Sequence, residues 1–141
     1  MSNAAEAPAP APVSEADIRA AVQAVIAAYA QALDAGRVDD LVDLFTPDGV
    51  SEIVGTGTFE GREAIRAAYS GFNPTRPQLH LVSNTVITAW TQNEATAISD
   101  LAFFQRASSG WVIRIVGRYH DTLRPHAGAW RFHRRVTTLL P

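Results

Sequence analysis

The sequence contains no cysteine and no lysine, and no apolar run long enough to cross a membrane. Without cysteine the chain can form neither disulfides nor thiolate metal sites, so its redox compartment is left open. All 12 basic residues are arginines, against 14 acidic residues, and the formal net charge is −2. No basic stripe that would bind nucleic acid is present. The N-terminus lacks the apolar core of a signal peptide, so we expect a cytoplasmic protein with no membrane contact.

The length of 141 residues and the hydrophobic content of 47% suit one domain with a single core. Residues 1–13 are rich in alanine and proline, and Pro8, Pro10 and Pro12 disfavour both helix and strand. We therefore expect a disordered tail over residues 1–13, without a catalytic role, followed by a single domain over residues 14–141.

Three helices are expected in the first half of the domain. The first opens at Ser14 and ends near Ala35, because Gly36 suits the position after a helix end. Its buried stripe follows helical spacing through Ile18, Val22, Val25, Tyr29 and Leu33. Shorter helices are expected over residues 38–45 and 61–72, separated by a turn at 46–49 and a weak strand pair over 50–58.

Four long strands are expected in the second half, over residues 78–90, 94–106, 111–124 and 129–140, with hairpin turn residues between them. Because the helices come first and the strands last, the pattern predicts an α+β fold with a strongly curved, mainly antiparallel sheet. A bent sheet wrapped over the first helix leaves a cone-shaped cavity between them.

His80 is the first candidate for chemistry in that cavity. Strand alternation places it on one face with Val82, Asn84, Val86 and Thr88. If this face lines the cavity, His80 is a general base held in an apolar pocket. The alternative, and the commoner situation for this residue type, is a histidine at a sheet edge that faces water.

The same alternation gives further candidates for the cavity wall: Asn84, Asp100, Phe104, Tyr119, Trp130 and Arg134. An aspartate among apolar neighbours is costly when it is buried without a partner, so we expect Asp100 to pair with Arg134 in the wall. The alternatives for Asp100 are a structural ion pair or a bulge that exposes it. Arg135 has the opposite parity and is expected to face solvent.

Tyr29, Asp34, His80 and Asp100 would form an acid/base set. Asp34 falls in the last turn of the first helix, where the helix dipole favours a cation beside it. An imidazole titrates near neutral pH, a carboxylate can fix its tautomer, and a phenol can donate to a carbonyl or leaving oxygen. Such a set suits elimination of water or halide, enolisation or epoxide opening. No phosphate-binding loop or histidine-rich metal motif is present, so we expect neither a cofactor nor a metal.

Several short motifs occur in a characteristic order: Tyr29 with Asp34, DDLVDLFTPDGV, FEGREAI, LHLVSN, GRYHDTL and GAWRFHRR. In this order the chain resembles SnoaL-like proteins of the nuclear transport factor 2-like superfamily. The resemblance implies a cone of three helices on a curved sheet, assembled as a homodimer or homotrimer. It also points to the branch that holds scytalone dehydratase, bile-acid 7α-dehydratase and hexachlorocyclohexane dehydrochlorinase. By that resemblance His80 is the base, Asp34 its partner, and Tyr29 and Asp100 further site residues.

The resulting expectation is a cofactor-independent lyase or isomerase, with a His–Asp dyad that acts on a small hydrophobic, cyclic molecule. A non-catalytic protein that binds a small molecule in the same cavity is the first alternative. A structural partner of an oxygenase, similar to the β-subunits of ring-hydroxylating dioxygenases, is the second. The fold alone does not choose among them.

Overall fold

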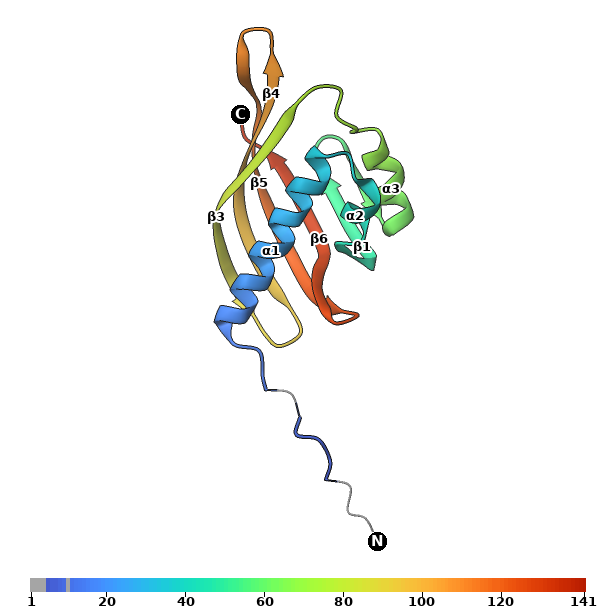
Figure 1. The fold of residues 1–141 in the computed structure, drawn as a ribbon, viewed down its shortest axis with the longest axis vertical. Helices are drawn as coiled ribbons and strands as arrows, with labels where there is room; N and C mark the ends of the chain where they lie inside the picture. The colour runs from blue at the N-terminus through green and yellow to red at the C-terminus, as the bar shows by residue number, and fades with distance from the viewer. Residues whose placement is uncertain (1–4, 10) are drawn as a thin grey trace.

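The computed structural model describes residues 5–9 and 11–141, and these contain three helices and six strands. The helices are α1 (Glu15–Asp34), α2 (Val38–Val42) and α3 (Arg62–Ser70). The strands are β1 (Phe45–Ile53), β2 (Gly57–Glu60), β3 (Gln78–Trp90), β4 (Ala95–Ala107), β5 (Gly110–His126) and β6 (Ala129–Leu139). Figure 1 shows α1 lying across one face of the curved sheet, with α2 and α3 beside β1. The expected α+β fold is confirmed.

All six strands form one sheet in the order β2-β1-β6-β5-β4-β3. Only the β1–β6 pair is parallel, and the other neighbouring pairs are antiparallel. Strand β3 therefore lies at an edge of the sheet, and one side of its backbone has no strand partner. We call the face that packs against α1 the inner face and the opposite one the outer face.

The first helix begins and ends where its sequence predicts. The Ser14 side chain accepts from the Asp17 backbone N–H, and the Asp17 side chain accepts from the Ser14 backbone N–H, which completes a capping box. The helix ends at Asp34, and Gly36 follows with φ of 69°. No basic residue lies in the last turn, so the carboxylate of Asp34 has no compensating cation on its own helix.

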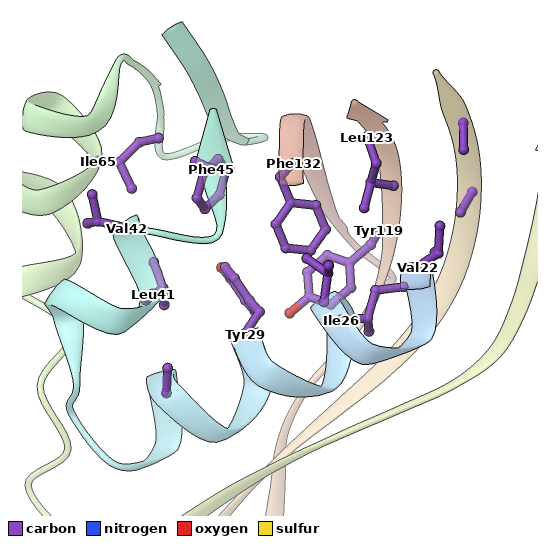
Figure 2. Packing of buried hydrophobic residues seen from close by; sticks show 14 of the residues in the cluster. Val22, Ile26, Tyr29, Leu41, Val42, Phe45, Ile65, Tyr119, Leu123 and Phe132 are labelled. Atoms are coloured by element: carbon purple, nitrogen blue, oxygen red, sulfur yellow. The ribbon is translucent and has the colours of Figure 1, made fainter. Parts of the chain in front are cut away.

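The core lies between α1 and the inner face. Tyr29 is its centre: the ring contacts Phe45, Tyr69, Tyr119 and Phe132 edge to face, with centroids 5.7 to 6.3 Å apart. Figure 2 shows how the Tyr29 ring from α1 and the Tyr119 ring from the sheet point toward one another in this cluster.

The second helix and the first strand differ from the expectation. Helix α2 ends at Val42, and β1 already begins at Phe45, so the segment expected to form a turn belongs to a strand. The reason is tertiary: Phe45 pairs with Phe132 of β6 and is fully buried, although the register of this pair then shifts before Val50. Burial of an aromatic ring in the core outweighs the local turn preference of Pro47-Asp48-Gly49.

A bulge interrupts β3 at Asn84. The β3–β4 register shifts by one residue between Ser83 and Val86, and Asn84 adopts φ of 54°, which asparagine tolerates better than most residues. Beyond it Val86 is 57% exposed, while Ile87 packs against the core. The alternation expected to unite His80, Asn84 and Val86 on one face is therefore wrong beyond Val82.

Bulges of the same kind interrupt the two last strands. Phe103 pairs with Ile115 but Phe104 pairs with Ile113, which leaves an extra residue in β5 and turns Trp111 and Ile113 outward. In β6 the register shifts between the partners of Thr122 and Leu123. Beyond this second bulge Arg135 lies on the inner face and is fully buried, although strict alternation predicts a solvent-facing side chain.

The expected tail lies partly outside the described residues, since residues 1–4 and 10 are not described. Its described residues form neither helix nor strand, but Val13 exchanges two hydrogen bonds with the Gln92 side chain, at 2.7 and 2.8 Å. In the described part of the chain, none of the helices has the length and apolarity needed to span a membrane.

Candidate active site

Asp34 holds His80 from two sides. The ring Nδ1 of His80 lies 2.6 Å from Asp34 Oδ1, and the backbone N–H of His80 donates to Asp34 Oδ2 at 2.7 Å. The backbone bond is available because β3 is an edge strand. Gln78, on the same strand face, donates to Asp34 Oδ1 at 3.2 Å. The expected contact between residues 46 positions apart is therefore present.

This contact fixes the tautomer of the neutral imidazole. An ionised carboxylate can only accept hydrogen bonds, so Nδ1 carries the proton and donates it to Asp34. Nε2 is then the nitrogen with a free lone pair. The side chains of His80 and Asp34 are only 11% and 13% exposed, and the His80 ring stacks on Phe103 with centroids 4.5 Å apart. The imidazole is thus fixed in orientation by a carboxylate on one side and by an aromatic ring on its face.

The pKa of Asp34 reflects two opposing effects. Burial of the carboxyl group acts to raise its pKa, because burial disfavours the charged form. The hydrogen bonds from His80 and Gln78, together with the charge of His80, lower the pKa by more, so it lies below its ordinary value. Asp34 is therefore an anion at neutral pH, and it can stabilise an imidazolium on His80.

His80 also lines a cavity of about 400 Å³ between the helices and the inner face. The walls are mainly apolar, with Leu33, Phe72, Leu101, Phe103 and Ile115 among them. Such a volume matches sites for small organic molecules. None of the side chains that line it belongs to an arginine, aspartate or glutamate. A hollow of about 500 Å³ lies on the other side of the dyad, between α1 and β3, and includes both Asp34 and His80.

Three tyrosines line the cavity together with His80: Tyr29, Tyr69 and Tyr119. The hydroxyl of Tyr29 lies 2.5 Å from that of Tyr69, which in turn lies 2.8 Å from Ser51 Oγ. Burial raises the pKa of all three phenols, so each stays protonated at neutral pH and can donate a hydrogen bond.

A buried cation lies behind the tyrosines. The guanidinium of Arg135 donates to both carboxylate oxygens of Asp121, at 2.8 and 2.9 Å, and both side chains are fully buried. Its carbon Cζ lies 3.6 Å from the ring centroid of Tyr119 and 4.3 Å from that of Tyr29. Nη1 of Arg135 has no hydrogen-bond partner among the described residues. This buried charge is paired on one edge and packed between aromatic faces on the others.

Asp100 lies on the outer face, away from the cavity. It accepts from Arg118 Nε at 2.9 Å and from the Asn84 side chain at 3.1 Å, so it does not pair with Arg134 as expected. Arg134 instead donates to Glu52 at 2.6 Å. The assumption that failed is which strand face is buried: Ser99 and Leu101 face inward, and Asp100 between them faces outward.

Other expected wall residues are also displaced from the cavity. Phe104 shares the outer face with Asp100, and Asn84 belongs to the bulge and to the hollow between α1 and β3. Trp130 is half-buried and packs against the core without lining the cavity. Of the expected residues, the structure brings His80, Tyr29 and Tyr119 to the cavity and places Asp34 directly behind His80.

Four further residues of the site are not among the expected candidates: Tyr69, Phe103, Asp121 and Arg135. Alternation does place Asp121 on the strand face of Tyr119. Tyr69 lies on the apolar face of α3, a pattern that indicates burial but not a polar contact. Arg135 is hidden by the bulge in β6, and no signal in the sequence marks it. In the described part of the chain, no three acidic or histidine side chains gather where they could hold a metal ion.

The fold and the site together define an α+β cone with a His–Asp pair beside an apolar cavity. The sequence pattern of the SnoaL-like domain matches residues 14–136, and the chain belongs to this family. Among curated proteins, no sequence matches the chain significantly.

Solved structures share the fold. A protein from Novosphingobium aromaticivorans, described provisionally as a scytalone dehydratase, is 24% identical with a TM-score of 0.78, over 88% of this chain and 85% of that one. A provisionally assigned β-subunit of an aromatic-ring-hydroxylating dioxygenase from the same organism is 20% identical with a TM-score of 0.77, over 91% and 93%. A Catenulispora acidiphila protein in complex with S-DNPA is 25% identical with a TM-score of 0.80, over 89% and 95%.

Proposed function

We propose that this protein is a cofactor-independent acid/base enzyme of the lyase or isomerase type, acting on a small hydrophobic molecule in the cavity. The observation that carries the proposal is the 2.6 Å contact between His80 Nδ1 and Asp34 Oδ1, made by a histidine that lines an apolar cavity. A buried histidine needs only one polar partner to be stable. A carboxylate on Nδ1 additionally leaves Nε2 free as a base.

In the proposed reaction, Nε2 of His80 removes a proton from a carbon of the substrate. Asp34 holds the tautomer before the transfer and stabilises the imidazolium after it. The electron pair of the broken C–H bond then either forms an enolate or expels a leaving group from the adjacent carbon. The apolar side chains in the walls lower the local dielectric constant, which strengthens the electrostatic interaction between the dyad and the developing charge.

The base can be tested before a natural substrate is known. 5-Nitrobenzisoxazole is a neutral bicyclic molecule that opens when a base removes its ring proton, and the N–O bond breaks to release a coloured phenolate. We expect the wild-type protein to accelerate this opening above free imidazole at the same concentration. His80→Gln, which cannot act as a base, should lower kcat by about 10²–10⁴-fold. Asp34→Asn should also lower kcat while leaving a measurable rate.

A non-catalytic protein that binds small molecules is the second candidate, and the size and apolar walls of the cavity favour it equally. It predicts that the probe binds, seen as protection against thermal unfolding, but is not turned over. Wild-type turnover no faster than that of His80→Gln would reject the enzyme proposal in favour of this one.

We also propose that the chain forms a homo-oligomer through the outer face of the sheet. Ile113 and Val86 are 59% and 57% exposed there, and Leu81 is 53% exposed. Large exposed apolar patches mark interaction surfaces. Ile113→Glu should shift the protein to a smaller species in sedimentation analysis. An oxygenase-partner role instead predicts a monomer that co-purifies with a larger chain when the two are co-expressed.

A further inference from the structure

Tyr119 stands apart from the other two phenols of the cavity. Its side chain projects from the inner face of β5, is 3% exposed as a residue, and lines the same cavity as His80. Among the described residues, no hydrogen bond joins its hydroxyl to another side chain or backbone group. The hydroxyl oxygen is also not one of the fully enclosed polar atoms that lack a partner, which indicates that it borders the open space of the cavity. Buried hydroxyls are normally paired, so a free one that borders a cavity is available to a ligand.

The hydroxyl of Tyr29, by contrast, is already engaged. Ser51, Tyr69 and Tyr29 form a chain of three hydroxyls joined by two hydrogen bonds. Each of the two hydrogen bonds uses one hydroxyl proton, so only one of the three protons remains for another acceptor. Tyr29 can therefore donate into the cavity only if Ser51 donates to Tyr69 and Tyr69 donates to Tyr29. The Tyr119 hydroxyl has no such restriction.

Arg135 packs against the face of the Tyr119 ring. Its guanidinium carbon lies 3.6 Å from the centroid of the Tyr119 ring, closer than to the ring of Tyr29 or Phe132. Asp121 holds the guanidinium in place through two hydrogen bonds. A cation on the ring face fixes the orientation of the ring and stabilises negative charge that accumulates toward the phenol oxygen.

The electrostatics keep this group protonated. Burial raises the pKa of Tyr119, and the positive charge of Arg135 offsets only part of that effect. The negative charge of Asp34 also acts at Tyr119 to raise its pKa, which places the phenol within electrostatic range of the dyad. The group is therefore a neutral donor at neutral pH.

We propose that Tyr119 is a catalytic residue whose hydroxyl donates a hydrogen bond to the substrate oxygen on which negative charge develops. The proposal rests on the proposed function of His80. As His80 takes the proton from carbon, the C–H electron pair forms a new double bond. The displaced pair moves to a carbonyl or leaving oxygen, which accepts from Tyr119. The cavity has no arginine in its walls to pair with a carboxylate. The substrate class is therefore a neutral molecule with a carbonyl, hydroxyl or cyclic ether oxygen, not an organic acid.

Two probes test this assignment on the full-length protein. 5-Nitrobenzisoxazole reports the rate, since its leaving oxygen becomes a phenolate. We expect Tyr119→Phe to lower kcat for this substrate by about 10²-fold with little change in KM. The reason is that the hydrogen bond from Tyr119 strengthens only as charge develops on the leaving oxygen. 4-Nitrophenol reports binding, because its visible absorption distinguishes the bound phenolate from the neutral phenol. We expect the wild-type protein to favour the phenolate and Tyr119→Phe to lose that preference. Benzoate should bind at least tenfold more weakly than benzaldehyde or benzyl alcohol.

Tyr29→Phe is the matched variant, since it removes a hydroxyl from the same cavity and should lower both signals less than Tyr119→Phe does. Removal of an unpaired hydroxyl is also not expected to lower the unfolding midpoint. A Tyr119→Phe protein that is clearly destabilised would show that the hydroxyl has a structural partner, and would overturn the proposal.

The two proposals fail in different ways. If His80→Gln abolishes turnover while Tyr119→Phe changes neither probe, the base stands and the role of Tyr119 is wrong. A second outcome is that neither the wild-type protein nor any variant turns over the benzisoxazole, while Tyr119→Phe alone loses the preference for bound 4-nitrophenolate. Tyr119 is then the oxygen donor of a site that does not use His80 as a base. Tighter binding of benzoate than of benzaldehyde would overturn the substrate class.

Discussion

One carboxylate fixes both the side chain and the backbone of one histidine: Asp34 Oδ1 accepts from the His80 ring, and Oδ2 accepts from the His80 N–H. A bidentate contact of this kind ties the end of α1 to the edge strand β3. It positions the imidazole relative to the sheet as well as relative to the acid. The contact should therefore matter for folding as well as for proton transfer.

The first prediction concerns pH and Asp34→Asn. Because the folded-state pKa of Asp34 is lowered, its stabilising contribution is present above the unfolded value and is lost as pH falls through the folded value. The wild-type protein should exceed the variant in free energy of unfolding at about pH 5, and the difference should shrink below about pH 4, near the unfolded pKa of aspartate. Urea unfolding at a series of pH values measures it. A difference that grows as pH falls would contradict the prediction.

The second prediction concerns the buried pair of Arg135 and Asp121. Arg135→Met alone leaves a buried carboxylate without its partner, so it should cost about 3–5 kcal/mol in free energy of unfolding. Combining it with Asp121→Leu removes both charges, and the double variant should recover most of that loss. Chemical denaturation of the two single variants and the double variant gives the coupling directly. Additive losses would show that the two side chains do not act as a pair.

The third prediction concerns the outer-face pair of Asp100 and Arg118, whose side chains are 33% and 44% exposed. An exposed ion pair contributes little, because water screens it and ordering the side chains costs entropy. Asp100→Asn should leave both the unfolding midpoint and benzisoxazole turnover close to wild-type. A loss of turnover comparable to that of Asp34→Asn would return Asp100 to the catalytic set and would require a different arrangement of β4.

The fourth prediction separates Val13 from the rest of the tail. Deletion of residues 1–12 should leave the melting temperature unchanged within about a degree. Deletion through Val13 removes both hydrogen bonds to Gln92 and an apolar contact with the core, so it should lower the melting temperature by about 4 °C per kcal/mol lost. Differential scanning fluorimetry of the full-length protein and the two truncated proteins compares their melting temperatures. Equal melting temperatures would place the domain boundary after Val13.

Local patterns predict the elements of this fold well. The capping box at Ser14, the glycine after α1 and the hairpin turns all place element ends within a few residues, because each depends on neighbouring residues alone. The contact of His80 with Asp34 is also anticipated, since an anion at a helix end and a histidine on an apolar strand face each need a partner. The resemblance to a known family supplied the pairing.

Side-chain direction along the strands is less predictable. Alternation assumes an unbroken pleat, and each bulge reverses it for the rest of the strand. Asn84, Val86 and Arg135 are misplaced for this reason. Asp100 is misplaced for a different one: its parity is right, but the choice of the buried face depends on where α1 packs. The Tyr119–Arg135 contact joins two strands across a bulge and has no local signature.

The bulge at Asn84 has a consequence for insertions and deletions. A relative that lacks the bulge needs one residue fewer between its counterpart of His80 and its counterpart of Trp90 to keep the same side chains inside. Aligned without a gap, such a relative would assign the counterpart of Val86 to the core and that of Ile87 to the surface. Deletion of Asn84 in this chain should correspondingly remove the extra residue and restore an unbroken pleat. Thr85 and Ile87 should then stay on the inner face and Val86 on the outer face, in register with the strand before the bulge.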